Sequence, residues 1–430
     1  MTFSARLLFA PMTLALFAAC SETNDTPNPI SASDASDATS AETSADTNAP
    51  PIDSTPIDSG IPADSASTDA VHDADADVVT DAGTAADCLP ASATDPFFTV
   101  MDASKCVVAQ YTVPVSSLSS LTWGKHGGPL GFEGSSTSLV RYKVPSATSG
   151  ALTVEKTAVT IPSLPSGIFW GSQAIDLPFF NWTAFGYTGT GAGFPGELVL
   201  TDGSALRRYH VNGFFAETAV GLTSGRIVYT GLSTIGTTAT TTNEGAVYAA
   251  DSCGSGGVHA LLPEGDPSCA APVKIATWEG GSSGPITADG RDDVFAILST
   301  FGGKQELRGF EKSTIARGQG ATAGVTMFSI TGYTSELAAD GNTVFYQSND
   351  ATTSTALDVS ALDYTVDATS KKIVPAAAGS RTLIKLAKSG TSVALVVDDR
   401  SRLWVGISNP ATGDAGPTSS TFFVLRDKTP

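Results

Sequence analysis

Histidines are scarce in the 430-residue sequence, which leaves few groups for acid–base or metal chemistry. The four are His72, His126, His210 and His259. No two are near enough in sequence to form a local metal pair, and the zinc-protease pattern H-E-x-x-H does not occur. Trp123 and Lys125 precede His126 in a Gly-rich stretch, which brings together a ring, a cation and a titratable group. Trp123 and His126 are therefore candidate ligand contacts, although an exposed loop between strands would also explain them.

One segment resembles a nucleophile motif. Residues 280–284 read G-G-S-S-G, which matches the G-x-S-x-G string of the α/β-hydrolases. That mechanism needs a strand, a strained turn and then a helix, whereas Pro285 and a β-type apolar segment follow here. We expect no catalytic role for Ser282, and the sequence predicts no metal site and no cofactor.

Several acidic residues stand at the ends of apolar segments. These are Asp202, Asp289, Asp340, Asp398 and Asp399. Turn formation accounts for them, because Asp and Gly supply backbone conformations that tight turns require. If their side chains instead converged, they could collect a sugar or act as the carboxylates of a hydrolase or lyase.

Two more aromatic residues are candidate ligand contacts. Trp170 follows Phe169, and Trp182 lies close after Phe179 and Phe180. An exposed cluster of this kind would suit stacking on a sugar or docking of a protein partner, but packing within a core would use the same residues.

The charge of the chain is concentrated in one segment. The formal net charge is −19, and residues 21–87 contain 15 acidic residues with no Lys, Arg or aromatic residue. Residues 88–430 therefore carry only −5. The segment is made mostly of Asp, Ser, Ala, Thr and Pro, and we expect it to be disordered because it cannot bury enough apolar area. No Lys/Arg-rich stripe is present, so the sequence excludes nucleic acid as a partner.

The N-terminus has the form of an export signal. Thirteen mainly apolar residues separate Arg6 from Cys20, whereas a membrane-spanning helix takes about 20. The run from Leu16 to Cys20 resembles the lipobox of bacterial lipoproteins, with Phe17 in the place where that family usually has Leu. The resemblance implies that residues 1–19 are a signal peptide and that Cys20 is lipidated. Ser21 resembles the residue found in the outer-membrane type, which predicts an exported protein anchored to the cell envelope.

Four cysteines remain after Cys20. They are Cys88, Cys106, Cys253 and Cys269. An even set in an exported chain is expected to be oxidised, and pairing Cys88 with Cys106 and Cys253 with Cys269 closes the shortest loops. Two other pairings are possible, and no spacing supports a zinc site.

The rest of the sequence predicts an all-β domain over residues 88–430, joined to the signal by a spacer over residues 20–87. Short β-branched or aromatic runs bounded by Gly, Pro, Asn or Asp cover residues 138–144, 225–229, 305–310, 325–328 and 371–374. No window predicts a helix of ordinary length.

An internal repeat underlies these strands. Residues 286–295 and 337–345 share the pattern of apolar strand, Asp-Gly and apolar–aromatic strand, and residues 395–404 fit the same template. The second strands of the repeat are expected at residues 206, 247, 294, 344 and 403, which gives an irregular period of about 50 residues.

A four-stranded unit of this length resembles a blade of the β-propeller superfamily. The resemblance implies six or seven blades over residues 88–430. The last repeat is one strand short, and residues 107–113 could supply the missing strand and close the ring. The alternative fold is a pair of β-sandwich domains.

These features predict a lipid-anchored envelope protein whose propeller-like domain binds a protein or a glycan. Binding needs no catalytic residues, and we expect the protein not to be an enzyme. The alternative function is a secreted hydrolase or lyase that uses carboxylates at the mouth of the propeller.

Overall fold

A computed structural model gives the structure of the chain. The described residues are 88–94, 97–114, 121–124, 127–132, 138–158, 168–170, 174–176, 183–189, 197–201, 206–209, 214–235, 242–251, 272–279, 283–299, 305–317, 324–330, 334–349, 356–387, 393–408 and 419–428. Contacts divide the chain into Met1–Val78 and Val79–Pro430, and all the described residues belong to the second unit. The expected signal peptide and nearly all of the spacer lie outside them.

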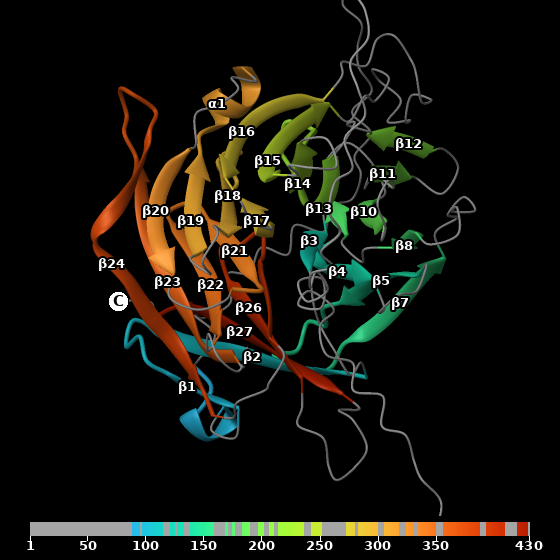
Figure 1. The fold of residues 1–430 in the computed structure, drawn as a ribbon. Helices are drawn as coiled ribbons and strands as arrows, with labels where there is room; N and C mark the ends of the chain where they lie inside the picture. The colour runs from blue at the N-terminus through green and yellow to red at the C-terminus, as the bar shows by residue number, and fades with distance from the viewer. Residues whose placement is uncertain are drawn as a thin grey trace, which may run out of the picture. The chain divides into compact units, whose positions relative to one another are not determined.

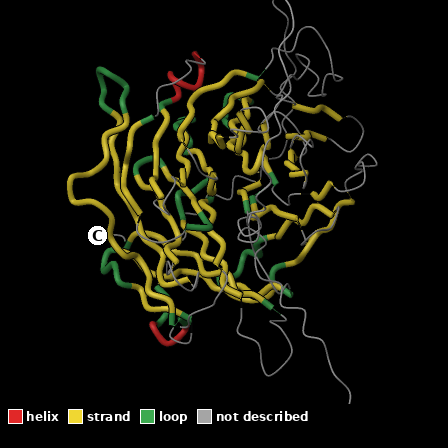
Figure 2. Tube along the Cα trace, viewed as in Figure 1, coloured by secondary structure: helices red, strands yellow, loops and turns green. Residues whose placement is uncertain are grey.

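The described strands form six sheets of four or five strands each (Figures 1 and 2). Sheet 1 contains β13 (Phe214–Gly221), β14 (Arg226–Ile235), β15 (Thr242–Asp251) and β16 (Val273–Glu279). Sheet 2 contains β17 (Ser283–Ala288), β18 (Val294–Ser299), β19 (Gln305–Phe310) and β20 (Val325–Ile330). Sheet 3 contains β21 (Leu337–Asp340), β22 (Thr343–Asn349), β23 (Ala356–Val366), β24 (Ile373–Leu386) and β1 (Phe98–Val100).

The other three sheets use strands from both ends of the domain. Sheet 4 contains β25 (Val393–Val397), β26 (Leu403–Ser408), β27 (Ser420–Asp427), β2 (Lys105–Val113) and β6 (Ser149–Ala151). Sheet 5 contains β3 (Thr122–Gly124), β4 (Gly128–Phe132), β5 (Ser138–Lys143) and β7 (Thr153–Ala158). Sheet 6 contains β8 (Ile168–Trp170), β9 (Ile175–Asp176), β10 (Thr183–Gly189), β11 (Glu197–Thr201) and β12 (Leu206–Tyr209).

Helices contribute little to the described residues. They comprise the 3₁₀ turn η1 (Ala91–Ala93) and the six-residue helix α1 (Lys312–Arg317). None of the described helices is long and apolar enough to cross a membrane.

The six sheets contact one another in a cyclic series. Strand β13 contacts β17, β17 contacts β21, and β21 contacts β25. The series continues from β25 to β3 and from β3 to β9, and β9 contacts β13 again. Such a ring of antiparallel sheets is a β-propeller, so the predicted all-β propeller fold is confirmed. The alternative of two β-sandwich domains is wrong, because a sandwich pairs two sheets instead of arranging six in a ring.

The chain closes this ring with a strand from its beginning. Strand β2 pairs antiparallel with β27, from Lys105 opposite Asp427 to Val113 opposite Ser420. The prediction that residues 107–113 complete the last repeat is therefore confirmed. Closure covers the edge that β27 would otherwise expose, and β6 then pairs in parallel with β2.

Successive sheets bury their facing surfaces against each other. In β18, Val294, Ala296 and Leu298 point into the core shared with sheet 1, while Phe295 and Ile297 point into the core shared with sheet 3. All five side chains are at most 1% exposed. A strand buried on both faces reads as a continuous apolar run, because alternate residues enter different cores.

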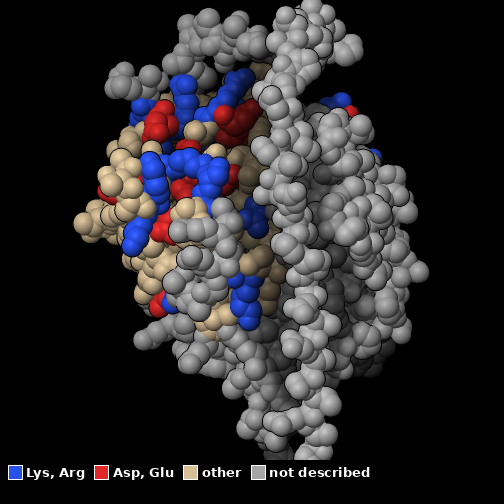
Figure 3. All heavy atoms as spheres, turned by 90° about the horizontal axis from the view of Figure 1, so that it is seen from above, with Lys and Arg blue, Asp and Glu red and all other residues tan. Residues whose placement is uncertain are grey.

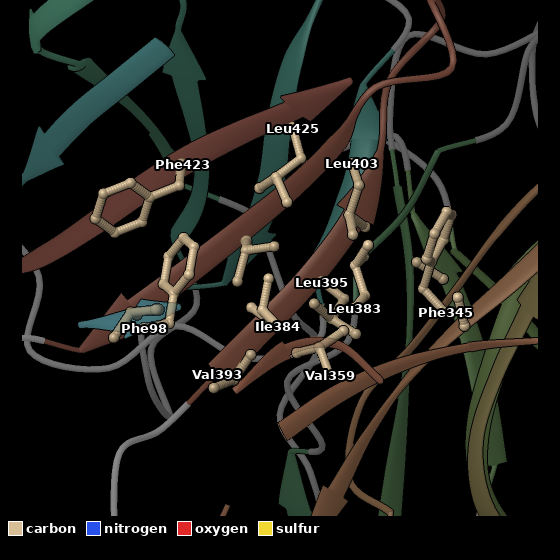
Figure 4. Close-up of a cluster of buried hydrophobic side chains, with 14 of the residues drawn as sticks. Phe98, Phe345, Val359, Leu383, Ile384, Val393, Leu395, Leu403, Phe423 and Leu425 are labelled. Atoms are coloured by element: carbon tan, nitrogen blue, oxygen red, sulfur yellow. The ribbon is translucent and has the colours of Figure 1, made fainter. Parts of the chain in front are cut away.

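Another core lies between sheets 3 and 4 (Figure 4). Phe423 from β27 and Phe98 from β1 meet edge to face with ring centroids 4.9 Å apart. Leu403, Val359 and Ile384 belong to the same cluster. Strand β1 thus fastens the start of the domain to both sheets, through β24 in sheet 3 and through this core.

The structure corrects two of the five repeat positions. Residues 294, 344 and 403 lie in second strands, as predicted, in β18, β22 and β26. Leu206 instead begins β12, the outermost strand of sheet 6, and Val247 lies in β15, the third strand of sheet 1. The second strand of sheet 1 is β14, and the turn before it begins with Leu222, so it lacks the Asp that marked the other repeats.

Candidate functional site

Three sheets have the same turn between their first two strands. The turns cover residues 222–226, 289–293 and 398–402. In each, the first residue donates its N–H to the carbonyl oxygen of the fifth, at N···O distances of 2.8, 3.0 and 3.0 Å. The fourth residue donates back to the carbonyl oxygen of the first, at 2.9, 3.1 and 3.1 Å. These hydrogen bonds define a three-residue hairpin loop.

The fourth position of this turn has left-handed backbone geometry. Its φ is 81° at Gly225, 69° at Asp292 and 58° at Ser401. Glycine takes this conformation without steric cost, whereas Asp and Ser are strained there. The prediction that Gly290 supplies the special backbone conformation is wrong, because the positive φ of that turn belongs to Asp292.

A buried aspartate caps two of the three turns. Oδ1 of Asp289 accepts the backbone N–H groups of Arg291 and Asp293, both at 2.9 Å. Oδ1 of Asp398 accepts those of Arg400 and Arg402, at 2.9 and 2.8 Å. The side chain thus replaces a backbone acceptor inside the loop, which is why Asp stands at this position.

Side chains satisfy the second oxygen of each of these carboxylates. Oδ2 of Asp289 accepts from Nε and Nη2 of Arg291, at 3.0 and 2.8 Å, and from the Tyr364 hydroxyl at 2.7 Å. Oδ2 of Asp398 accepts from Nε of Arg402 at 2.7 Å and from Nε1 of Trp404 at 2.9 Å. Asp289 is 4% exposed and Asp398 is 6% exposed, so both carboxylates are buried and are satisfied by groups of the chain, of which Tyr364 and Trp404 are also buried.

Polar contacts also join the turns of neighbouring sheets. Asp292 accepts the N–H and the hydroxyl of Thr223, both at 2.6 Å, which links sheet 2 to sheet 1. Tyr364 of sheet 3 reaches Asp289 of sheet 2. Ser401 donates to Asp340 at 3.0 Å, which links sheet 4 to sheet 3. We call residues 222–226, 289–293, 340–343 and 398–402 the turn belt, and these contacts place its four turns at one end of the ring.

Three acidic or phenolic groups of the belt have shifted pKa values. Burial acts to raise the pKa of Asp292, but hydrogen bonds from Thr223 and the charge of Lys312 outweigh it and hold that pKa below its usual value. Burial, with the charge of Asp289 nearby, raises the pKa of Asp293. Burial and the Asp289 carboxylate raise the pKa of Tyr364, so the phenol stays protonated and donates its hydrogen bond.

At this end of the ring, four acidic side chains are buried, whereas the basic side chains that pair with them are partly exposed. Asp289, Asp292, Asp293 and Asp398 are at most 6% exposed. The side chain of Arg291 is 42% exposed and that of Lys312 is 59% exposed, although both pair with the buried acids. Seen from above, Lys and Arg side chains gather over this end with acidic side chains among them (Figure 3).

One predicted ligand contact lies beside the belt. Trp123, in β3, is half-buried, and its ring centroid is 5.3 Å from that of Trp404, the residue that donates to Asp398. Trp123 therefore packs partly against the core between sheets 4 and 5. Trp170 lies in β8 opposite Tyr187. His126 and Trp182 fall outside the described residues, and so does Asp202.

The cysteine prediction is confirmed for one pair. Cys88 and Cys106 form a disulfide with a Cα–Cα distance of 5.6 Å. It joins the residue where the described domain begins to the start of β2. Cys20, Cys253 and Cys269 lie outside the described residues.

The described carboxylates of the three repeat turns do not converge as the acid and base of a hydrolase would. Asp289, Asp340 and Asp398 stand on three separate turns, and the oxygens of Asp289 and Asp398 are occupied by groups of the chain itself. Where the structure describes the chain, no group of three or more His, Cys, Asp or Glu residues is placed to hold a metal ion.

The side chains that hydrogen-bond to Asp289 and Asp398 could not all be predicted from the sequence. Arg402 and Trp404 belong to the repeat that contains Asp398, but Tyr364 comes from another sheet and is distant from Asp289 in sequence. An Arg two residues after the capping Asp identifies the partner of Asp289, Arg291, but in the other turn it indicates Arg400 instead of the true partner Arg402.

Comparisons with known proteins give distant structural similarities only. No protein-family model matches the sequence, and no curated protein matches it. An aldose sugar dehydrogenase from Streptomyces coelicolor, in its PQQ-bound form, is 11% identical with a TM-score of 0.45, over 76% of this chain and 98% of that one. A gluconolactonase from Xanthomonas campestris is 11% identical with a TM-score of 0.40, over 79% and 94%. An α-L-arabinofuranosidase from Fusarium graminearum is 8% identical with a TM-score of 0.39, over 74% and 92%. Similarity at this level says nothing about activity, and the fold described above rests on the strand order.

Proposed function

We propose that the protein is a lipid-anchored protein of the cell envelope whose propeller binds a protein or a glycan at the end formed by the turn belt. We also propose that each of the six sheets is one blade, because the contacts of the innermost strands return to their starting point. The single observation that carries the binding function is the turn belt. It fixes four turns relative to one another and presents exposed polar side chains outward.

The belt exposes hydroxyl, amide and guanidinium groups, which can form hydrogen bonds with a ligand. Thr223, Ser224 and Ser401 present hydroxyls, Asn342 presents an amide, and Arg291 presents part of its guanidinium. Because hydrogen bonds join the turns to one another, binding loses little conformational entropy at these positions. Loops on a rigid β scaffold are the usual place for such surfaces.

The anchor is supported by the sequence alone. Cys20 follows an apolar segment with a single early Arg, and 15 acidic residues follow in the spacer. A charged spacer repels itself and extends, which would hold the propeller away from a membrane. Ser21 favours the outer membrane as the destination.

The anchor is tested by fractionating cells that express Cys20→Ser, with Ser21→Ala as the matched control. We expect Cys20→Ser to leave the membrane pellet and to lose incorporation of labelled fatty acid. Ser21→Ala should keep both. If Cys20→Ser stays in the pellet at the wild-type level, lipid does not hold the protein there.

The binding end is tested by placing a photo-reactive amino acid at Asn342 or Ser401 and irradiating intact cells. Thr382, which is exposed on β24, is the control position. We expect covalent adducts from the two turn positions and none from Thr382, and mass spectrometry then identifies them as protein or glycan. Absence of adducts at both turn positions, or equal adducts at all three, would argue against a binding end here.

A further inference from the structure

The outermost charges at the belt end are mainly basic. Exposed cations come from two turns of the belt, from helix α1 and from the connection between β23 and β24. They are Arg291, Arg400, Lys312, Lys371 and Lys372, which we call the basic rim. Among the described residues of these segments, the exposed acids are Asp367 and Asp399.

Topology brings the rim residues to one end. In an antiparallel sheet the connection between the first and second strands and that between the third and fourth lie at the same end. Lys312, in the connection from β19 to β20, confirms this, because its Nζ lies 3.2 Å from Asp292 and its backbone N–H donates to Asp293 at 2.9 Å. Lys371 and Lys372 occupy the corresponding connection of sheet 3.

Arg291 is held in a fixed direction. Its guanidinium lies 5.4 Å from the centre of the Tyr364 ring and donates two of its N–H groups to Asp289. A guanidinium has five N–H donors in a rigid fork, so donors remain on the side that is exposed. A carboxylate or similar anion arriving from solvent would meet a preorganised donor.

A neutral sugar or a large protein interface fits this end less well. In the segments of the belt and the rim that the structure describes, no aromatic side chain is exposed, so these segments offer no ring for stacking on a neutral sugar. Protein interfaces depend on a few aromatic or apolar anchors in a desolvated centre. Near the rim, Val374 is the exposed large apolar side chain, at 47%.

The buried acids also limit how strongly the ligand can be charged. They lie directly beneath the rim, and residues 88–430 as a whole carry −5, so little long-range attraction reaches a dense polyanion. Attraction arises only at contact, where the ammonium and guanidinium groups meet single anionic groups. A polymer with one charge per unit and many hydroxyls fits this pattern, because Thr223, Ser224 and Ser401 stand beside the cations.

We propose that the basic rim binds an acidic polysaccharide, with carboxylate groups of the uronic acid kind facing the ammonium and guanidinium groups of the five rim residues. The inference rests on the proposed binding function and names its ligand class.

Binding of polygalacturonate to the detergent-solubilised full-length protein tests this, with dextran as the neutral polymer and polyglutamate as the acidic peptide. We expect retention by polygalacturonate only, weakening as salt is added. Lys371→Gln/Lys372→Gln and Lys312→Gln/Arg400→Gln should each weaken binding about tenfold, which corresponds to roughly 0.7 kcal/mol for each lost contact. Lys156→Gln/Lys385→Gln removes the same charge from exposed sites on β7 and β24 and should leave binding unchanged.

Three results would overturn the inference: no binding of polygalacturonate, equal binding of polyglutamate, or equal weakening by the control pair. The photo-adducts separate this failure from failure of the proposed function. Protein adducts at Asn342 or Ser401 without polygalacturonate binding would leave the binding end in place and remove only the acidic glycan.

Discussion

The turns at residues 289–293 and 398–402 share one backbone and differ in the side chains that complete it. In both, a buried Asp at the first position accepts the N–H groups of the third and fifth residues. The arginine that pairs with this Asp comes from the third position in one turn, Arg291, and from the fifth in the other, Arg402. The Asp caps the loop in the same way in both turns, whereas the balancing arginine stands at the third position in one turn and at the fifth in the other.

The residues at the fourth position of the two turns differ in burial and in the neighbouring sheet that they contact. Asp292 is fully buried and reaches sheet 1, whereas Ser401 is exposed and reaches sheet 3 through a single hydrogen bond. Both residues have a left-handed backbone conformation, which Asp tolerates better than Ser. The first is compensated by several hydrogen bonds and the second by one, so substitutions at equivalent positions should have unequal effects.

Replacing the capping aspartates should have the largest effect. Asp289→Ala and Asp398→Ala each leave a buried donor unsatisfied beside an uncompensated arginine, so each should lower the free energy of unfolding by about 3 kcal/mol. Denaturant unfolding of the purified protein measures this. Asp340→Ala is the control, because Asp340 is half-buried and should cost less than about 1 kcal/mol. If the free energy of unfolding fell equally in all three variants, the two capping aspartates would contribute no more to stability than Asp340.

Removing the aromatic donor to each carboxylate should have a smaller effect at Tyr364 and a comparable effect at Trp404. Tyr364→Phe deletes only the hydroxyl that donates to Asp289, which should cost about 1–2 kcal/mol. Trp404→Phe deletes the donor to Asp398 and also leaves a cavity, so it should cost about 3 kcal/mol. The Trp404 ring stacks on Tyr111 with centroids 5.6 Å apart and also contacts Trp123. If the two substitutions cost the same in denaturant unfolding, this packing contributes nothing.

Glycine at the fourth position should give opposite results in the two turns. Ser401→Gly removes the steric cost of the left-handed conformation, which stabilises the folded protein by about 1 kcal/mol. It also loses one exposed hydrogen bond, so the free energy of unfolding should stay the same or rise slightly. Asp292→Gly gains less relief, because Asp tolerates the left-handed conformation better, and loses the contacts to Thr223, Ser224 and Lys312, so it should be less stable by about 1–2 kcal/mol. Gly225→Ala introduces the strain without compensation and should also destabilise. Thermal unfolding at one pH ranks the three variants.

The smallest expected effect is a pH dependence of opposite sign at two neighbouring acids. The pKa of Asp292 is lowered in the folded state, so its contribution to stability is present above the unfolded value of about 3.9 and is lost as the pH falls through the lowered value. The pKa of Asp293 is raised, so its charge costs stability near neutral pH, and the cost disappears in acid.

Asp292→Asn should therefore be less stable than the wild type at pH 7, and Asp293→Asn should be more stable. Both differences should shrink as the pH approaches 3. Unfolding curves between pH 3 and pH 7 would measure this, and differences of the same sign in the two variants would contradict the assignment.

The sequence predicts the fold well where a strand and its turn carry their own signal. The repeats at Asp289, Asp340 and Asp398 could be recognised because an Asp, an apolar strand and an aromatic residue fall in a short window. The second strand of sheet 1 was missed because Leu222 and Gly225 form the same turn without an acid. Gly225 takes the left-handed conformation there, so this turn forms without a capping Asp side chain.

The candidate site was less predictable because its contacts cross between sheets. Tyr364 is distant in sequence from Asp289, and its place in the belt follows from packing rather than from a local pattern. The same is true of Trp123, which the sequence singled out for its neighbours in the chain but which packs against Trp404. The positions of the acids could be expected at turns, but their depth relative to the arginines could not.

The disulfide between Cys88 and Cys106 decides where a mechanical load enters the domain. A pull on the chain before Cys88 passes directly to the start of β2, where Cys106 stands opposite Arg426 of β27. The segment between the two cysteines, including η1 and β1, is bypassed and bears no tension. The ring-closing pair of strands then resists the force, and β1 keeps its place on β24 while the bridge is intact.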